Sequence, residues 1–243
     1  MTKEMSKRQQ RREKMRRQQQ RSRLITIGLV TLGAIFLAYV FIAPNLKPVG
    51  EIATAVPKEH PQAEGTALGD PNAPVKIDIF EDFQCPSCRT FTEEVGPQLI
   101  ETYVATGQVY YVFHHYAFLD TNTVTKESQQ AANAAMCANE QGKFWEYHDV
   151  LFANWNGENQ GAFSDRRLLA FAETVDGLDI DAFTACFEED RYEDDIKADF
   201  ELGQQMGVTG TPSVFVNGEI ISPGFIPQFT DIQQAIEAAL GAQ

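Results

Sequence analysis

The sequence Cys85-Pro86-Ser87-Cys88 places two cysteines three residues apart, a spacing with two common chemical uses. One is metal ligation, but a structural zinc site needs about four ligands, usually from a second pair with similar spacing. Cys137 and Cys186 are far from this pair and from each other, and His114-His115 is not spaced as a ligand pair. The other use is reversible thiol–disulfide exchange. We therefore expect a redox-active pair with no metal and no bound cofactor.

The position of the pair between two predicted elements favours redox chemistry. Residues 75–80 alternate as a strand does, and residues 87–104 repeat apolar side chains every four residues, as an amphipathic helix does. Cys85 then faces the unpaired N–H groups and the positive dipole end of the helix, and both stabilise its thiolate. Pro86 suits the first helical turn because its missing N–H costs no hydrogen bond there. Cys88 lies one turn on, where it can resolve a mixed disulfide. An inert structural disulfide is the alternative.

Two further segments complete the predicted sheet. Residues 109–116 form a second strong strand pattern, so the cysteine pair lies at the first junction of a strand–helix–strand unit. Strand character returns at residues 213–216, directly after Thr211-Pro212. Proline is poorly tolerated inside a central strand, so Pro212 begins this strand or forms a special turn, for which a cis Thr211–Pro212 bond is one form.

The first 68 residues divide into three segments of different composition. The net charge of the chain is −14, yet residues 1–23 carry +8 (ten Lys or Arg against two Glu), which leaves −22 for the rest. Residues 24–43 hold no charge, and a helix of that length reaches about 30 Å, the thickness of a bilayer's hydrocarbon core. Residues 44–68 are rich in Pro, Ala, Glu and Thr and predict a flexible linker.

The charge asymmetry predicts a single-pass protein with a cytoplasmic N-terminus and an extracytoplasmic domain. A cleaved signal peptide is the alternative, because Ala53-Thr54-Ala55 resembles a cleavage site, although it lies some ten residues beyond the apolar run. Anionic lipid headgroups are a simpler partner for the basic tail than nucleic acid. Four cysteines in an exported domain allow three pairings, and Cys85–Cys88 with Cys137–Cys186 is the most economical.

Together these features resemble the DsbA family of thioredoxin-fold thiol–disulfide oxidoreductases, particularly its membrane-anchored members of the BdbD type. The resemblance covers about residues 69–240 and rests on motifs in the family's order: DFQCPSC, QGKFWEYH, GVTGTPS and FVNG, at residues 82–88, 141–148, 207–213 and 215–218. It implies an α/β thioredoxin fold over residues 69–243, with an inserted helical domain at about 122–205 and the transmembrane helix ahead of it.

The resemblance also implies roles for individual residues. Cys85 is the exposed attacking cysteine and Cys88 the resolving one. Pro212 is the cis-proline beside them, and the backbone of Thr211 pairs with substrate peptide by strand addition. Related proteins often bridge the positions of Cys137 and Cys186, so a structural disulfide is expected there.

Other residues near the motif are expected to modulate it. Well-known oxidising members have His at the third motif position, whereas Ser87 offers only a hydroxyl, so we expect a less extreme oxidant. Pro86 sets the helix start, and Asp82 or Glu81 is placed to relay protons to Cys88, although a solvated strand end is equally ordinary. His114-His115 follows a strand end, which leaves a position beside the active site open, although a surface position is the ordinary expectation.

The function expected from these residues is oxidation of unfolded exported polypeptides that carry free thiols. The family implies that a quinone-linked membrane partner reoxidises the Cys85–Cys88 pair. A reductase or isomerase, for instance in cytochrome c maturation, is the first alternative. A non-catalytic module that holds extended peptides beside Pro212 is the second. The acidic run at residues 188–195 leaves a cation site open, although most such runs are solvated surfaces.

Overall fold

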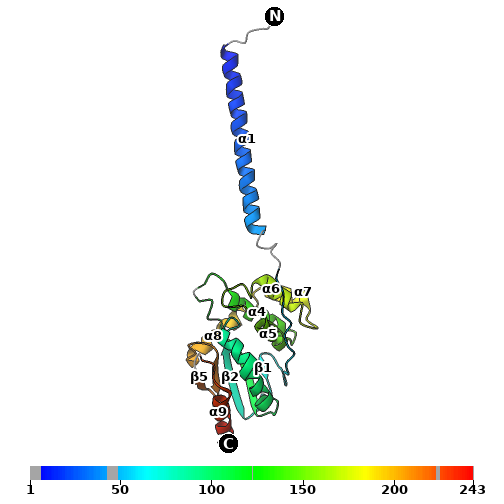
Figure 1. Ribbon diagram of the computed structural model, residues 1–243, viewed down its shortest axis with the longest axis vertical. Coiled ribbons are helices and arrows are strands. Elements are labelled where there is room, and N and C mark those ends of the chain that lie inside the picture. The colour runs from blue at the N-terminus through cyan, green and yellow to red at the C-terminus, as the bar shows by residue number, and fades with distance from the viewer. Residues whose placement is uncertain (1–6, 43–48, 122, 223–224, 243) are drawn as a thin grey trace. The chain divides into compact units, whose positions relative to one another are not determined.

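The structure is a computed structural model of the chain (Figure 1). It describes residues 7–42, 49–121, 123–222 and 225–242. The chain divides into two compact units, Met1–Gly50 and Glu51–Gln243, and each is described by itself.

The first unit contains the helix α1 (Lys7–Ile42), which runs unbroken from the basic segment into the apolar one. Its stretch Lys14–Val40 is long and apolar enough to cross a membrane, judged by length and composition. Large apolar side chains along it, among them Leu24 and Phe36, are exposed. Such a surface suits hydrocarbon better than water. Residues 43–48, which hold the end of the predicted span and the start of the predicted linker, lie outside the described residues.

The second unit is built on a five-stranded sheet in the order β1-β3-β2-β4-β5. Its strands are β1 (Ala67–Leu68), β2 (Val75–Glu81), β3 (Val109–His115), β4 (Ser213–Val216) and β5 (Glu219–Ser222). β2 and β3 are parallel because a helix crosses between them, and the other neighbours are antiparallel. The predicted strand–helix–strand unit is therefore confirmed.

The crossover helix contains two wide turns. It consists of α2 (Pro86–Thr90), the π-helical η2 (Phe91–Val95), α3 (Gly96–Leu99) and the π-helical η3 (Ile100–Val104). Pro97 interrupts the α-helical bonding, since it falls in the first turn of α3, directly after η2. The cause is that proline has no N–H to bond the preceding turn, and the wide i→i+5 bond from Gly96 to the Phe91 carbonyl accommodates the gap.

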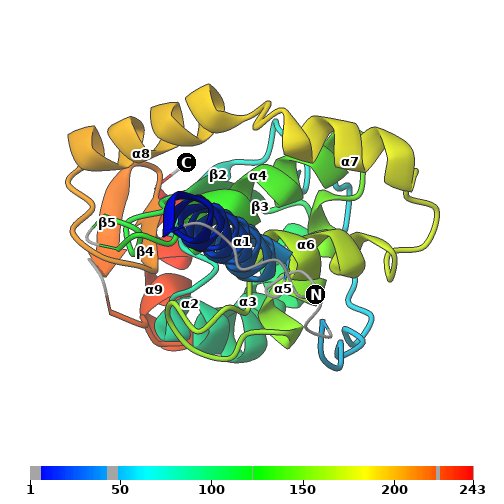
Figure 2. The same ribbon diagram turned by 90° about the horizontal axis from the view of Figure 1, so that it is seen from above.

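Helices cover both faces of the sheet (Figure 2). On one side lie the α2–η3 helix and α9 (Phe229–Gly241), and on the other lies α8 (Glu193–Met206). The first face buries Ile77 and Ile79 of β2 against the larger core cluster. The second buries Phe80 in a smaller aromatic cluster that includes Tyr116 and Phe215. Each such side chain contributes about 1.5–3 kcal/mol when fully buried.

A helical insertion separates β3 from β4. It comprises α4 (Glu127–Asn139), α5 (Phe144–Ala153), α6 (Asp165–Ala172), α7 (Ile180–Glu188) and α8. Cys137 of α4 and Cys186 of α7 are joined by a disulfide with an S–S distance of 1.98 Å. The expectation of an inserted helical domain is confirmed, and its predicted first residue, Asn122, lies outside the described residues.

Residues 51–64, which we call the strap, are packed on the second unit and are not a free linker. The Ala53 N–H donates to Asn154 Oδ1 at 2.8 Å, and Asn154 Nδ2 donates back to the Ala53 carbonyl at 2.9 Å. Ile52 and Ala55 pack against the core. The predicted flexible linker over 44–68 is thus wrong for its second part, because sparse apolar residues and backbone groups of the strap find partners on α5 and the loop after it.

Candidate active site

The cysteine pair begins α2 at the end of β2. Cys85 is the N-cap residue, with extended backbone at φ −73° and ψ 123°, and Pro86 is the first helical residue. Both cysteines are free thiols. Cys85 is 6% exposed and Cys88 is 0% exposed, so only Cys85 reaches the surface, and it does so less openly than the expected exposed cysteine. The reason is that the Thr211 carbonyl lies directly against its sulfur.

The environment makes the two sulfurs chemically unequal. The pKa of Cys85 is lowered to about 6, chiefly because the Cys88 thiol donates a hydrogen bond to its sulfur. The backbone N–H groups of Ser87 and Cys88 add to this effect, and partial burial opposes it. Burial raises the pKa of Cys88 well above its ordinary value. Of the two sulfurs, that of Cys85 is therefore the one suited to act as nucleophile and leaving group, whereas the Cys88 thiol must first lose its proton.

The sheet brings Thr211-Pro212 to the pair from 126 residues away. Phe80 of β2 pairs with Ser213 of β4, which places the preceding residues beside the start of α2. The Thr211–Pro212 peptide bond is cis. The Cys85 thiol donates to the Thr211 carbonyl at 3.3 Å.

The two neighbouring carboxyl groups, Glu81 and Asp82, have different surroundings. Asp82 accepts hydrogen bonds from the Ser128 hydroxyl at 2.6 Å and from the backbone N–H groups of Gln84 and Leu119. These contacts tie the end of β2 to α4, and burial raises the pKa of Asp82 to about 7. These contacts give Asp82 a structural role at the end of β2, and its role as a modulator of the cysteines stays a prediction.

Glu81 is buried on the face that the cysteines share. Burial, and secondly the charge of Cys85, raise its pKa well above the ordinary value, and its charge in turn raises that of Cys88. Thr92 Oγ1 donates to Glu81 Oε2 at 3.5 Å. Among the described residues, Glu81 Oε1, His115 Nε2 and Thr211 Oγ1 are buried without a hydrogen-bond partner. The alternation of Ile77, Ile79 and Glu81 in the sequence already carried the signal that Glu81 faces inward.

The two histidines of β3 are not ordinary surface residues. His114 lies between Asp78 Oδ1 at 2.8 Å and Asp199 Oδ1 at 3.2 Å. Burial lowers its pKa, but these two carboxylates outweigh that effect and raise the value to about 9. His115 is buried and neutral, because burial lowers its pKa to about 4. His114 thus fastens α8 to the sheet.

The sequence patterns do not indicate several of the contacts that the structure shows around the cysteine pair. Trp155 Nε1 donates to the Gln84 carbonyl at 2.6 Å, and the Arg89 guanidinium lies 5.4 Å from the Trp155 ring centre. Gln84 Nε2 donates to Asp120 Oδ1 at 3.1 Å. Only the folded insertion brings these residues to the motif.

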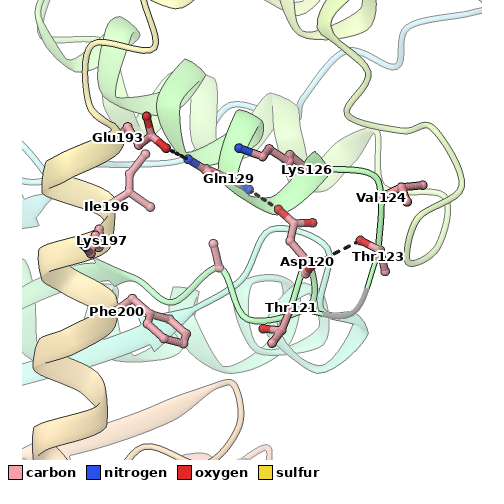
Figure 3. A pocket seen from close by; sticks show the side chains of 11 residues that line it. Asp120, Thr121, Thr123, Val124, Lys126, Gln129, Glu193, Ile196, Lys197 and Phe200 are labelled. Carbon is pink, nitrogen blue, oxygen red and sulfur yellow. Dashed lines mark hydrogen bonds between the residues drawn. The ribbon is translucent and has the colours of Figure 1, made fainter.

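Asp120 also lines a surface cavity of about 400 Å³ between the β3–α4 loop, α4 and α8 (Figure 3). Ile196 and Phe200 of α8 form an apolar wall of this cavity, and Lys126 and Glu193 are among the polar residues that line it (Figure 3). No cysteine of the pair lines it.

In the described part of the chain, no three His, Cys, Asp or Glu side chains gather as a metal site. In the acidic run at 188–195, Arg191 binds Glu189 and Glu140, and Gln130 donates to Asp190. These contacts offset part of the negative charge of residues 188–195.

Comparison with known proteins agrees with this geometry. A family model described as thioredoxin matches residues 62–238. The probable disulfide bond formation protein D of Bacillus anthracis is 29% identical over 175 residues, which cover 72% of this chain and 77% of that protein. A Na⁺/H⁺ antiporter NhaA 3 of Salinispora tropica is 36% identical over 150 residues, 62% of this chain but only 21% of the antiporter.

The crystal structure of oxidised BdbD from Bacillus subtilis has the same fold, with a TM-score of 0.65 and 23% sequence identity. The superposition covers 78% of this chain and 100% of that one.

Proposed function

This chain belongs to the thioredoxin family and is a DsbA-like thiol–disulfide oxidoreductase, and we propose that it works outside the cytoplasm as a dithiol oxidase for exported proteins. The observation that carries the proposal is the lowered pKa of Cys85 at the start of α2. A stabilised thiolate favours the reduced form of the pair, and a pair whose reduced form is stabilised is a strong oxidant.

The proposed reaction begins with the Cys85–Cys88 disulfide. A client thiolate attacks the Cys85 sulfur, the S–S bond breaks, and Cys88 leaves with the electron pair and takes up a proton. A second client thiolate then attacks the client sulfur of the mixed disulfide and releases Cys85 as a thiolate. Two electrons pass from the client to the pair. The client is oxidised, and the enzyme is left as one thiolate and one thiol.

Thr211 and Pro212 are the proposed client-binding residues. The Thr211 carbonyl already contacts the Cys85 sulfur, so a peptide that pairs with this backbone holds its own thiol close to Cys85. Unfolded polypeptides suit such a site because strand addition needs an extended backbone.

The membrane placement is a proposal from α1. Its apolar stretch anchors the chain, and the Lys and Arg residues before that stretch hold the N-terminus in the cytoplasm. Clients are then exported proteins, and a quinone-linked membrane reoxidase removes the two electrons from the reduced pair.

A redox titration of the full chain against glutathione tests the direction. We expect a potential more oxidising than that of glutathione but below the value of about −120 mV reached by the strongest family member, because Ser87 supplies only its backbone N–H to Cys85. A value near about −270 mV, that of thioredoxin, favours the reductase or isomerase alternative instead. A Cys85→Ser variant that keeps full activity favours the non-catalytic peptide-binding alternative.

A further inference from the structure

The cavity that Asp120 lines, which we call the α8 cavity, has apolar walls and room for a side chain of another molecule. Its volume of about 400 Å³ lies in the range of ligand sites. Figure 3 shows Ile196 and Phe200 of α8 on one side of it and Val124 of the β3–α4 loop on the other. Val124 is fully exposed, so this apolar side chain leaves water only when something outside the fold covers it. An apolar group of a ligand therefore gains free energy by binding here.

Lys126 brings a positive charge to the α8 cavity. It is the N-cap residue of α4, and its amine makes no ion pair or hydrogen bond with any residue that the structure describes. By contrast, Lys58 and Lys143 of the same unit each pair with a carboxylate, at 3.2 Å and 3.0 Å. Lys197, which also lines the cavity, lies 3.9 Å from Glu201 and is 69% exposed. These ammonium groups suit a ligand that carries a carboxylate.

The acidic residues of the α8 cavity are already engaged within the protein. Asp120 accepts hydrogen bonds from the backbone N–H groups of Ser128 and Gln129, at 3.1 Å and 2.8 Å. Glu193 accepts one from Gln129 Nε2 at 3.2 Å (Figure 3). The positive end of α4 thus offsets the charge of Asp120, and the charge that remains for a ligand is positive.

The α8 cavity lies close to Cys85. Gln84, the residue before Cys85, donates from Nε2 to Asp120 Oδ1 at 3.1 Å. Because one glutamine side chain bridges the two places, the cavity is only a few residues of extended peptide away from Cys85, at about 3.3 Å per residue.

A second contact ties the cavity to the cis-proline segment. Phe200 stacks on Tyr116 with ring centres 4.6 Å apart, and Tyr116 Oη donates to the Val208 carbonyl at 3.0 Å, just ahead of Thr211. The cavity therefore lies on the face of the sheet that α8 covers, the face that also buries Phe80. A polypeptide that pairs with the Thr211 backbone can reach it.

We propose that the α8 cavity is a client subsite, which binds an apolar side chain of the polypeptide whose thiol reacts at Cys85 and, through Lys126, an acidic residue beside it. The inference rests on the proposed dithiol oxidase function and adds to it a substrate class. The preferred client cysteines lie a few residues from an aromatic or branched aliphatic residue with a neighbouring Asp or Glu.

The test measures how fast synthetic peptides with one cysteine reduce the Cys85–Cys88 disulfide of the oxidised full chain in detergent micelles. The peptides differ in one pair of residues, Phe-Glu, Phe-Lys or Ser-Glu. The pair is placed at each position up to about five residues from the cysteine on either side, because alternate residues of an extended chain face opposite ways. Peptide is in excess, and acid-quenched samples are analysed by mass spectrometry. Each initial rate is divided by that of the same variant with dithiothreitol, so a general change at Cys85 cancels.

The variants are Lys126→Glu and, as a matched control, Lys143→Glu. Both lysines are N-cap residues of helices and neither caps its helix with its side chain, so the two substitutions make the same change of charge at equivalent places. Lys143 does not line the α8 cavity. The ratio of the Phe-Glu to the Phe-Lys rate is compared between variants, which cancels the effect of Glu or Lys on the peptide's own thiol.

At the positions that reach the cavity, we expect Lys126→Glu to lower this ratio about fivefold, the scale of an exposed ion pair that becomes a repulsion. Lys126→Met gives an intermediate ratio, Lys143→Glu stays within about twofold of the wild type, and about 0.5 M salt brings the ratios together. Val124→Ser slows both Phe peptides about two- to fourfold and leaves the Ser-Glu peptide unchanged, because the apolar contact is lost.

Equal ratios for Lys126→Glu and Lys143→Glu at every position overturn the inference. So does a wild type that reacts no faster with the Phe-Glu peptide than with the Ser-Glu peptide at any position. A wild-type disulfide that dithiothreitol reduces but no peptide reduces refutes the proposed function instead.

Discussion

The stability of the reduced protein should depend on pH in a way that the oxidised protein's does not. The pKa of Cys85 falls from 9.0 to about 6 in the fold. Because the pKa of Cys85 is lowered, its thiolate adds to the free energy of unfolding of the reduced protein. This contribution is complete only above about pH 9 and is lost as pH falls through about 6. Each pH unit corresponds to about 1.36 kcal/mol, so the full contribution is about 4 kcal/mol.

At working pH the contribution is smaller. Linkage gives about 2.7 kcal/mol at pH 8, about 1.4 kcal/mol at pH 7 and less than about 0.1 kcal/mol at pH 5. For a two-electron couple, about 1.4 kcal/mol corresponds to about 30 mV toward the oxidising side at pH 7. Cys88 adds almost nothing in this window, because its thiol stays protonated in the fold and nearly so in the unfolded chain.

The assay is denaturant unfolding of the full chain in both redox states between pH 5 and pH 8. The constraint that the Cys85–Cys88 disulfide places on the unfolded chain does not depend on pH, and carboxyl groups such as Asp82 titrate in both states. The difference between the two unfolding free energies therefore reports the Cys85 thiolate, together with the Glu81 carboxyl group to which its charge is coupled. We expect it to change by about 2.6 kcal/mol in favour of the reduced form from pH 5 to pH 8. A difference that stays constant across this range would show that the thiolate is not stabilised, and would remove the main support for the oxidase direction.

Three further predictions concern stability, measured by denaturant unfolding. Asp199→Asn should lower the free energy of unfolding by about 2–3 kcal/mol at pH 6 and by much less at pH 10. The reason is that the raised pKa of His114 gives stability that is complete below about pH 6.5 and is lost as pH rises through about 9. An equal loss at both pH values contradicts this. Gly203→Ala should cost about 1–3 kcal/mol despite the better helix propensity of alanine, since its Cβ would lie 2.7 Å from an aromatic ring, and an unchanged midpoint would disprove the overpacking. Replacing Cys137 and Cys186 together by alanine should lower the free energy of unfolding by about 4 kcal/mol, as expected for a bridge with a sequence separation of 49. A loss below about 1 kcal/mol would mean that the disulfide does not constrain the unfolded chain.

The sequence alone determined the secondary structure around the motif, because these elements depend on residues that are close to one another in the chain. Alternation over residues 75–80 predicted β2, four-residue periodicity predicted the helix after the motif, and Pro86 marked the helix start. Because Cys85 and Cys88 are part of these elements, their place at the strand–helix junction follows from local structure. The charge-free segment from residue 24 likewise identified the apolar helix without any tertiary information.

The tertiary structure decided what surrounds the pair. Sequence reasoning left Asp82 and Glu81 open as proton relays. In the structure Glu81 continues the inward face of β2, and a face becomes inward only when another layer packs on it. Trp155 comes from a segment whose periodicity says nothing about the motif, and long-range packing alone places it there. The position of the two sulfurs at the strand–helix junction was therefore set by the local sequence, while the packed sheet decided their burial and the contact of Cys85 with Thr211.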